Sequence, residues 1–178
     1  GMQNFSNSLA ALALADTLGI DNDISLKALK SYHGIDRRFE YKGKIGDVTV
    51  IDDYAHHPTE IRATLTAAEK YPHKELWVVF QPHTYTRTKA FFDDFAMALS
   101  KADHVVLADI YAARETDTLG INSGMLMQRI NELGGHADYF KSFDEIENYL
   151  LQNCNPNDML ITMGAGDVHK IGENLLGL

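Results

Sequence analysis

Two carboxylates, a phenol and two imidazoles stand within six consecutive positions, from Asp52 to His57. The carboxylates could bind a metal ion, act as acid or base, or accept hydrogen bonds from the hydroxyls of a sugar. The imidazoles could hydrogen-bond to a substrate, with a charge that changes near neutral pH. The alternative is a solvated loop in which these residues stand by chance. Pro58 follows at a position that suits the first turn of a helix, and free N–H groups at a helix start favour an anion.

A second polar cluster, residues 81–88, follows an apolar run at 75–80 that predicts a buried strand. Arg87 has threonines on both sides, and its guanidinium could bind a carboxylate or a phosphate through two parallel hydrogen bonds. The alternative is that a threonine caps the following helix while Arg87 is solvated. These two interpretations are compatible.

Three histidines, His56, His57 and His83, could be considered as metal ligands, since imidazole binds zinc well. Adjacent side chains at a helix start point in different directions, so His56 and His57 cannot easily share one ion. We therefore expect no metal site here, and expect these histidines to bind a substrate through hydrogen bonds instead.

The clusters need a scaffold that brings the ends of several strands together. Apolar, strand-like runs alternate with helical patterns over residues 48–176, and this alternation predicts an α/β fold with a largely parallel sheet flanked by helices. Four of the expected strands end in polar or glycine residues, at 52–58, 81–88, 109–115 and 163–167. Because the carboxyl ends of parallel strands lie along one edge of a sheet, we expect these four segments to converge there.

The glycines of the last segment, Gly164 and Gly166, would let the backbone approach a ligand closely. The segment lacks the full spacing of a dinucleotide-binding motif, so it is a weak signal by itself. A phosphate-binding P-loop of the form G-x-x-x-x-G-K-[ST] is absent from all 178 residues. A nucleotide-activating enzyme would need that element from elsewhere.

Residues 36–51 predict a β-hairpin, because aromatic and charged residues alternate before a glycine-rich turn and a β-branched run. This pairing would bring Arg37 and Arg38 close to Asp52 and Asp53. The preceding segment, residues 4–33, predicts two short helices. It is too small for a domain, so we expect the tail of an upstream domain or an added helical arm.

Composition excludes several classes of protein. The chain of 178 residues suits one domain, or a domain and a fragment of another. A net charge of −9 argues against non-specific binding to nucleic acid. Cys154 is the single cysteine, so there is no internal disulfide, and a reducing compartment is expected. No apolar run reaches the roughly 20 residues of a membrane span, and no secretory signal is visible, so we expect a cytoplasmic protein without membrane contact.

Several long strings resemble the C-terminal domain of the Mur ligases. They are Arg37-Arg38-Phe39, Asp52-Asp53-Tyr54-Ala55-His56-His57-Pro58-Thr59-Glu60-Ile61, Phe80-Gln81-Pro82-His83-Thr84-Tyr85-Thr86-Arg87-Thr88 and Gly164-Ala165-Gly166-Asp167. The resemblance extends over essentially the whole chain and implies a Rossmann-like domain at 35–178. Residues 1–34 then resemble the helical tail of the central ATPase domain that precedes it in this family.

The resemblance also implies an activity. Mur ligases have a domain for the UDP-sugar, a central P-loop ATPase and this closing domain, and the similarity is greatest to members that join L-alanine to UDP-N-acetylmuramate in peptidoglycan precursor synthesis. In this reaction ATP phosphorylates the muramoyl carboxylate and leaves as ADP. The amine then attacks the acyl phosphate, so that an amide forms and phosphate is released. The partners implied are UDP-N-acetylmuramate, L-alanine, ATP and the two other domains, with magnesium held mainly by the central domain. This fragment would then be inactive alone.

Roles follow from the resemblance position by position. Arg38 and Asp53 would hold the nucleotide, Asp53 through the ribose hydroxyls. The residues expected at the amino-acid and muramoyl end are Tyr54, His56, His83 and Arg87, with Arg87 on the alanine carboxylate. Many relatives carry Arg where this chain has Thr84, so Thr84 is left out of the site. No catalytic residue is expected on this chain.

Three other interpretations remain open at the level of sequence. The ligase that recycles murein tripeptide shares much of the same pattern, and the amino-acid pocket distinguishes the two. A nucleotide-binding module without chemistry is compatible with the missing P-loop. A metal-dependent hydrolase built on the His and Asp cluster would contain stoichiometric metal.

Overall fold

The computed structural model describes residues 2–32 and 34–178, and the side chains of residues 5–32 and 34–178. Gly1 and His33, which fall within the predicted helical tail at 1–34, lie outside the described residues. The chain divides into two compact units, Gly1–Ile35 and Asp36–Leu178.

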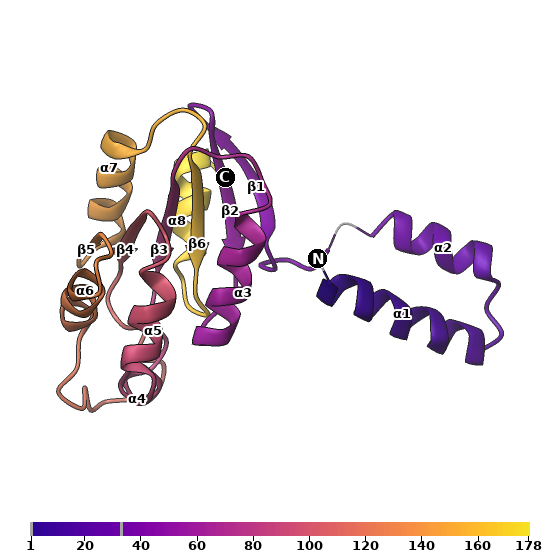
Figure 1. The fold of residues 1–178 in the computed structure, drawn as a ribbon, viewed down its shortest axis with the longest axis horizontal. Coiled ribbons are helices and arrows are strands. Elements are labelled where there is room, and N and C mark those ends of the chain that lie inside the picture. The colour runs from indigo at the N-terminus through magenta and orange to yellow at the C-terminus, as the bar shows by residue number, and fades with distance from the viewer. Residues whose placement is uncertain (1, 33) are drawn as a thin grey trace. The chain divides into compact units, whose positions relative to one another are not determined.

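The second unit is built on one six-stranded sheet, counted over the described residues, with strand order β1-β2-β6-β3-β4-β5 (Figure 1). The strands are β1 (Glu40–Ile45), β2 (Val48–Asp53), β3 (Leu76–Phe80), β4 (His104–Leu107), β5 (Ala137–Tyr139) and β6 (Met159–Met163). Only the pairing of β1 with β2 is antiparallel; the other four pairings are parallel. The predicted α/β fold with a largely parallel sheet is confirmed.

Helices cover both faces of this sheet, with α3 and α5 in front of it in Figure 1 and α8 behind it. The helices of this unit are α3 (Pro58–Ala68), α4 (Tyr85–Ala90), α5 (Phe92–Leu99), α6 (Ser123–Glu132), α7 (Phe143–Asn153) and α8 (His169–Leu176). Neighbouring strand residues point to opposite faces: Val78 packs in the core with α3, α5 and α6, and Val79 in the core with α7 and α8. Because both faces are covered, the central strands are continuous apolar runs.

The predicted hairpin is confirmed, with its turn at Gly46 and Asp47 rather than from Gly43 onward. Both turn residues have positive φ, 53° and 64°, as a tight hairpin turn requires. Gly43 lies inside β1, next to a shift in the register of the two strands. The register pairs Glu40 with Asp52, so the residues just before β1 lie beside the end of β2.

The helix after β3 begins earlier than expected. The sequence predicts it from about Lys89, but α4 starts at Tyr85, and a break at Phe91 separates it from α5. Thr84 is the N-cap, because its hydroxyl accepts a hydrogen bond from the Arg87 amide. The amides of Tyr85 and Thr86 are bound by a carboxylate from the loop after β4. That tertiary partner stabilises a helical turn that local sequence does not indicate.

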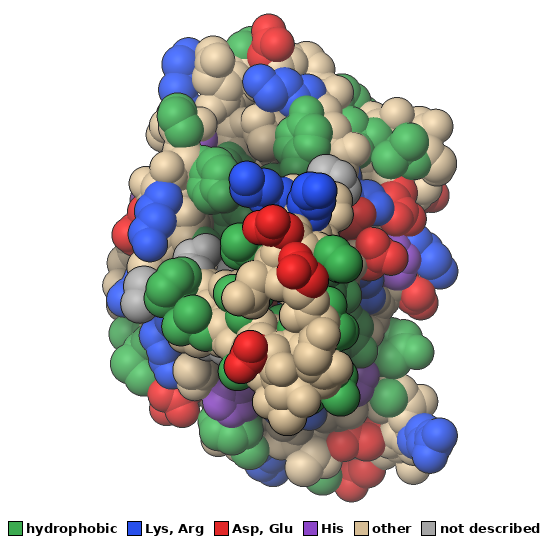
Figure 2. All heavy atoms as spheres, turned by 90° about the vertical axis from the view of Figure 1, so that its right-hand side faces the viewer, with side chains coloured by type: hydrophobic (Ala, Val, Ile, Leu, Met, Phe, Trp, Pro, Cys, Tyr) green, Lys and Arg blue, Asp and Glu red, His purple; other side chains and the backbone are tan. Residues whose placement is uncertain are grey.

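The first unit consists of two helices, α1 (Met2–Thr17) and α2 (Asn22–Lys30). The sequence predicts Asp23 as the cap of the second helix, but the cap is Asp21, whose carboxylate accepts a hydrogen bond from the Asp23 amide. Among its described side chains only Ser25 is buried. Its large exposed apolar residues are Phe5, Leu9, Leu14, Leu18, Ile20, Ile24, Leu26, Tyr32 and Ile35. Exposed hydrophobic side chains are visible among charged ones on the face drawn in Figure 2. None of the described helices is both long and apolar enough to cross a membrane.

A helical pair that buries so little apolar surface lacks the packing that stabilises short helices, whereas the second unit has two cores of its own. We expect a chain of residues 36–178 to unfold cooperatively with a Tm within about 4 °C of the 178-residue chain. A peptide of residues 1–35 should be mostly non-helical by circular dichroism. Loss of cooperative unfolding in the shortened chain would contradict this division.

Candidate functional site

The four polar strand ends meet along one edge of the sheet. Hydrogen bonds continue between the strands past their ends: the Gly164 amide donates to the Asp53 carbonyl over 3.1 Å, and the Gln81 amide donates to the Met163 carbonyl over 3.1 Å. The strands β2, β6, β3 and β4 are consecutive neighbours in the sheet. The predicted convergence of the four segments is therefore confirmed.

Asp52 and Arg37 form a largely buried ion pair at this edge. Arg37 Nε lies 2.8 Å from Asp52 Oδ2, and the two side chains are 21% and 2% exposed. The other carboxylate oxygen, Oδ1, accepts a hydrogen bond of 2.7 Å from the Thr162 hydroxyl of β6. Asp52 thus has partners on both oxygens, which places it in the framework rather than in the binding surface.

The same arginine holds the glycine segment after β6. Arg37 donates to the carbonyl of Gly164 over 2.7 Å and to the carbonyl of Gly166 over 3.2 Å. Its guanidinium carbon lies 4.9 Å from the centre of the Tyr54 ring, within the range of a cation–π contact. The backbone closes the arrangement, because the Tyr54 amide donates to the Arg37 carbonyl over 2.7 Å. The sequence predicted that Arg37 lies near Asp52 and Asp53. It did not predict the contacts of Arg37 with the glycine carbonyls and with Tyr54.

The glycines after β6 are needed for packing against Gln81. A Cβ at Gly166 would lie 2.4 Å from Gln81 Oε1, and one at Gly164 would lie 2.8 Å from the Gln81 carbonyl oxygen. Gly164 also has φ of 147°, which disfavours other residues. The sequence predicts that these glycines let the backbone approach a ligand closely. In this structure the group that the backbone approaches closely is Gln81.

Asp53 is buried and well satisfied. Its carboxylate accepts hydrogen bonds from the Ala55 amide (2.8 Å), the Phe39 amide (3.0 Å) and the Thr64 hydroxyl (3.1 Å). Burial raises the pKa of Asp53, and these hydrogen bonds and Arg38 oppose that rise. A carboxylate has about four acceptor positions, so one remains for a further donor such as a ribose hydroxyl.

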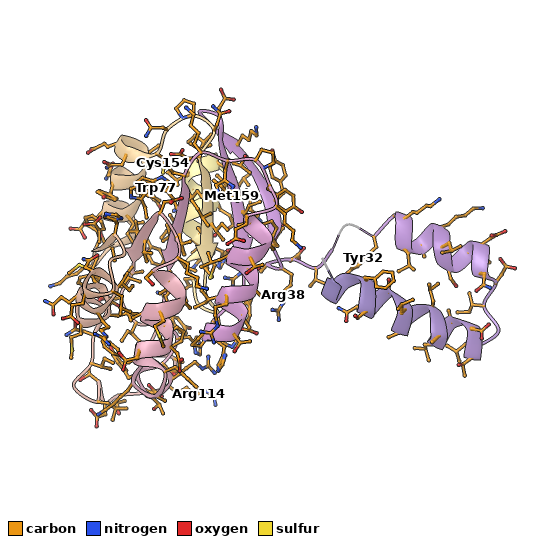
Figure 3. All side chains as sticks on the ribbon, viewed as in Figure 1. Tyr32, Arg38, Trp77, Arg114, Cys154 and Met159 are labelled. Carbon is orange, nitrogen blue, oxygen red and sulfur yellow. The ribbon has the colours of Figure 1, made fainter. Side chains whose placement is uncertain are left out.

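Arg38 differs sharply from its neighbour Arg37. Its side chain is 54% exposed, and its nearest ion-pair partner, Glu60, is 3.9 Å away. Figure 3 shows Arg38 at the surface of the α/β unit and Trp77 inside it. The Arg38 guanidinium carbon also lies 5.9 Å from the centre of the Tyr54 ring. This arginine is available to an anionic ligand.

The two adjacent histidines have different tasks. His57 is the N-cap of α3: its Nδ1 accepts a hydrogen bond from the Thr59 amide, and its ring packs on Phe91 with 4.7 Å between ring centres. His56 turns the other way, with Nδ1 2.9 Å from the Tyr54 carbonyl oxygen and 3.5 Å from a Glu60 oxygen. Within the described part of the chain, no group of three His, Cys, Asp or Glu side chains is arranged to hold a metal ion.

His83 lies between several site residues. Its ring stacks on Tyr111 with 5.4 Å between ring centres, and it is 6.2 Å from the His56 ring. Its Nδ1 is buried without a hydrogen-bond partner among the described residues. Burial lowers the pKa of His83 below its ordinary value of 6.5, and the charges of Arg87 and His56 lower it further. His83 is therefore neutral at pH 7.

Arg87 stands in the first turn of α4, partly exposed, and makes no ion pair within the described ranges 5–32 and 34–178. The structure thus brings Tyr54, His56, His83 and Arg38 to one edge with Arg87 and Asp53. It adds Arg37, Gln81, Tyr111 and Glu115, which sequence reasoning did not assign. The sequence indicated Gln81, Tyr111 and Glu115 only as members of the polar segments after two expected strands, and Arg37 only through the predicted hairpin.

A model of the family described as Mur ligase, glutamate ligase domain, matches residues 37–166. The chain therefore belongs to this family, as the strings at its strand ends indicated.

The relatives include named enzymes. The chain is 62% identical over 176 residues to the UDP-N-acetylmuramate–L-alanine ligase of Agathobacter rectalis, covering 99% of this chain and 38% of that protein. It is 49% identical to the enzyme of the same name from Clostridium botulinum strain Okra, covering 100% of this chain and 39% of that protein. The chain thus spans well under half the length of these relatives.

Solved structures agree with this assignment. The UDP-N-acetylmuramate-alanine ligase of Thermotoga maritima matches with a TM-score of 0.82 and 32% identity, over 99% of this chain and 37% of that one. A murein peptide ligase from Psychrobacter arcticus matches with a TM-score of 0.70 and 28% identity, over the same shares.

Arg37 and Arg38 give a matched pair for testing the framework. We expect Arg37→Met to lower the free energy of unfolding by about 3–5 kcal/mol, because it leaves the buried Asp52 carboxylate without its cation. Arg38→Met should cost less than about 1 kcal/mol, because its ion pair is long and exposed. Urea unfolding of both variants measures the difference. Equal losses would contradict the framework role of Arg37, because its buried ion pair would then contribute no more than the exposed contact of Arg38.

His83 should titrate below 6.5 in a pH series of its imidazole NMR signals, because burial and Arg87 disfavour its charged form. Since the unfolded chain then binds more protons than the folded chain, His83 should lower stability as the pH falls through 6.5. Arg87→Gln should raise the His83 pKa, and Lys89→Gln on the same helix should change it less. A wild-type pKa at or above 6.5 would contradict the buried, cation-flanked environment.

Proposed function

We propose that this chain is the closing C-terminal domain of an ATP-dependent ligase that joins L-alanine to UDP-N-acetylmuramate. The observation that carries the proposal is the partly exposed Arg87 beside neutral His83, at the strand edge of a chain 62% identical to a ligase of that name. A guanidinium without an ion-pair partner suits the carboxylate of an amino acid.

The remaining substrate residues surround that position. Tyr54 and His56 contact each other edge to face, with 5.4 Å between ring centres. The ring centres of His56 and His83 are 6.2 Å apart, and the two rings are tilted by 55°. We assign them to the amino-acid and muramoyl end of the ligand. Their hydrogen-bonding groups bind and orient; they do not form a covalent intermediate on this chain.

The nucleotide end is assigned to Arg38 and Asp53. The exposed Arg38 guanidinium fits a phosphate or the face of a base, and Asp53 retains about one acceptor position for a ribose hydroxyl. ATP supplies the phosphoryl group that activates the muramoyl carboxylate, with magnesium. Since the sequence contains no P-loop, we assign the phosphates and magnesium mainly to another domain of the parent protein, and place the reaction in the cytoplasm, where ATP is available.

Residues 1–34 are then the helical tail of the central ATPase domain, and residues 35–178 the C-terminal domain. The support is physical: the first unit exposes large apolar side chains that another part of a longer protein would cover. The relatives are long enough to provide it, since this chain spans 38% of one of them. We expect the isolated fragment to have no ligase activity.

The other interpretations are weaker. The murein peptide ligase matches with lower identity and a lower TM-score than the L-alanine ligase from Thermotoga maritima. A metal-dependent hydrolase would need a cluster of metal ligands, and the described side chains contain no group of three His, Cys, Asp or Glu arranged to hold a metal ion. A binding module without chemistry is separated from the ligase by measuring turnover.

The test is ADP release by the full-length parent protein with UDP-N-acetylmuramate, ATP and magnesium. We expect turnover with L-alanine and none with murein tripeptide. Arg87→Gln should raise the KM for L-alanine by about tenfold to a hundredfold, as the loss of a charged hydrogen bond predicts. Lys89→Gln, which removes a positive charge from the same helix, is the control and should leave it unchanged. Turnover with tripeptide alone, or with neither, would overturn the proposal.

A further inference from the structure

We propose that Glu115 binds the ammonium group of L-alanine while Arg87 binds its carboxylate, so that the two side chains together select a free α-amino acid. This inference rests on the proposed function and deepens it. Glu115 lies in the irregular loop between β4 and α6. The sequence by itself places it in the polar segment 109–115 but gives it no individual role.

The structure fixes Glu115 next to Arg87. Glu115 Oε2 accepts hydrogen bonds from the backbone amides of Tyr85 and Thr86, the latter over 3.1 Å. These are the two residues directly before Arg87 in α4. The carboxylate is therefore held by backbone groups at the start of the helix that carries the arginine.

The loop that carries Glu115 is itself tied to the end of β3. The Tyr111 amide donates to the Pro82 carbonyl over 2.8 Å, and the Thr84 amide donates to the Tyr111 carbonyl over 2.8 Å. His83 pairs with Tyr111 in an isolated parallel bridge and stacks on its ring. The loop and the site segment are thus one hydrogen-bonded assembly.

The charges around this point match a zwitterion. The charges of Arg87 and Glu115 both act on His83 and in opposite directions: Arg87 lowers the pKa of His83 and Glu115 raises it. Hydrogen bonds from the hydroxyl and amide of Thr86 and from the amide of Tyr85 lower the pKa of Glu115, so it is anionic at neutral pH. Across the described side chains, Glu115 and Arg87 do not pair with each other or with another charged group. The Glu115 carboxylate is bound at the two residues that directly precede Arg87. An accessible anion and cation presented by the same helical turn, each lacking an ionic partner, complement the ammonium and carboxylate of an amino acid.

The competing explanation is that Glu115 only caps α4. Both explanations use the same hydrogen bonds, but they differ in what they require of the charge. Capping needs an acceptor, which an amide oxygen supplies, whereas binding an ammonium group is strengthened by a negative charge. Glu115→Gln separates the two.

In the full-length ligase, Glu115→Gln should raise the KM for L-alanine about tenfold or more, as expected for a lost charged hydrogen bond. The KM values for ATP and UDP-N-acetylmuramate and the Tm should stay close to those of the wild type. Asp117→Asn is the matched control: it lies in the same loop, its carboxylate also accepts a backbone hydrogen bond, from Leu119 over 2.8 Å, and it loses the same charge. It should leave all three KM values unchanged.

A second measurement uses propionate, which has the carboxylate of alanine but no ammonium group, as an inhibitor competing with L-alanine. Its inhibition constant should be unchanged or lower in Glu115→Gln, while the KM for L-alanine rises. An unchanged KM for L-alanine, or equal weakening of propionate and alanine, would overturn the role of Glu115. Absence of L-alanine turnover by the wild type would instead overturn the proposed function, so the two failures are distinguishable.

Discussion

The Arg37–Asp52 ion pair is the contact on which the site edge depends. A carboxylate that is 2% exposed is costly unless it is paired and hydrogen-bonded, and here Arg37 and Thr162 satisfy both of its oxygens. The guanidinium has donors left over, and it uses them on the carbonyls of Gly164 and Gly166. One planar side chain therefore fixes the end of β2, the segment after β6 and the position of Tyr54 relative to each other.

The residues assigned to ligands differ from this framework in one physical respect: they keep unused binding capacity. Arg38 and Arg87 are charged groups without close ionic partners, counted over the described side chains. His83 has a buried nitrogen for which the described residues supply no partner. The buried nitrogen of His83 costs stability as long as it lacks a partner, and a ligand that satisfies it removes that cost. The two arginines are at least partly exposed and can bind an anion. These groups gather at the carboxyl ends of the strands, which is where a parallel sheet binds ligands.

The local patterns of the sequence were sufficient for most of the fold. Alternation of apolar runs and helical segments predicted the parallel sheet. The string Ser142-Phe143-Asp144-Glu145 has the pattern of a capping box and predicts a helix start, and Ser142 is the N-cap of α7. The wrong expectation, a helix from Lys89, came from a segment whose first turn is stabilised by Glu115, thirty residues away in the chain. For the site, the sequence indicated which strand ends carry functional groups, because ligands bind beyond the carboxyl ends of the strands in a parallel sheet.

What the sequence determined by itself is most of the elements and the edge at which the functional groups meet. Hydrophobic periodicity is a local property of the chain, and the carboxyl ends of parallel strands share one edge of a sheet. Family resemblance added roles for particular positions. Only the tertiary structure decided which of two adjacent residues serves the framework: Arg37 rather than Arg38, and His57 rather than His56. The two residues of each pair have the same side chain, so the sequence cannot distinguish them. Their difference arises from burial and from partners distant in the chain, such as Gly164 for Arg37 and Phe91 for His57.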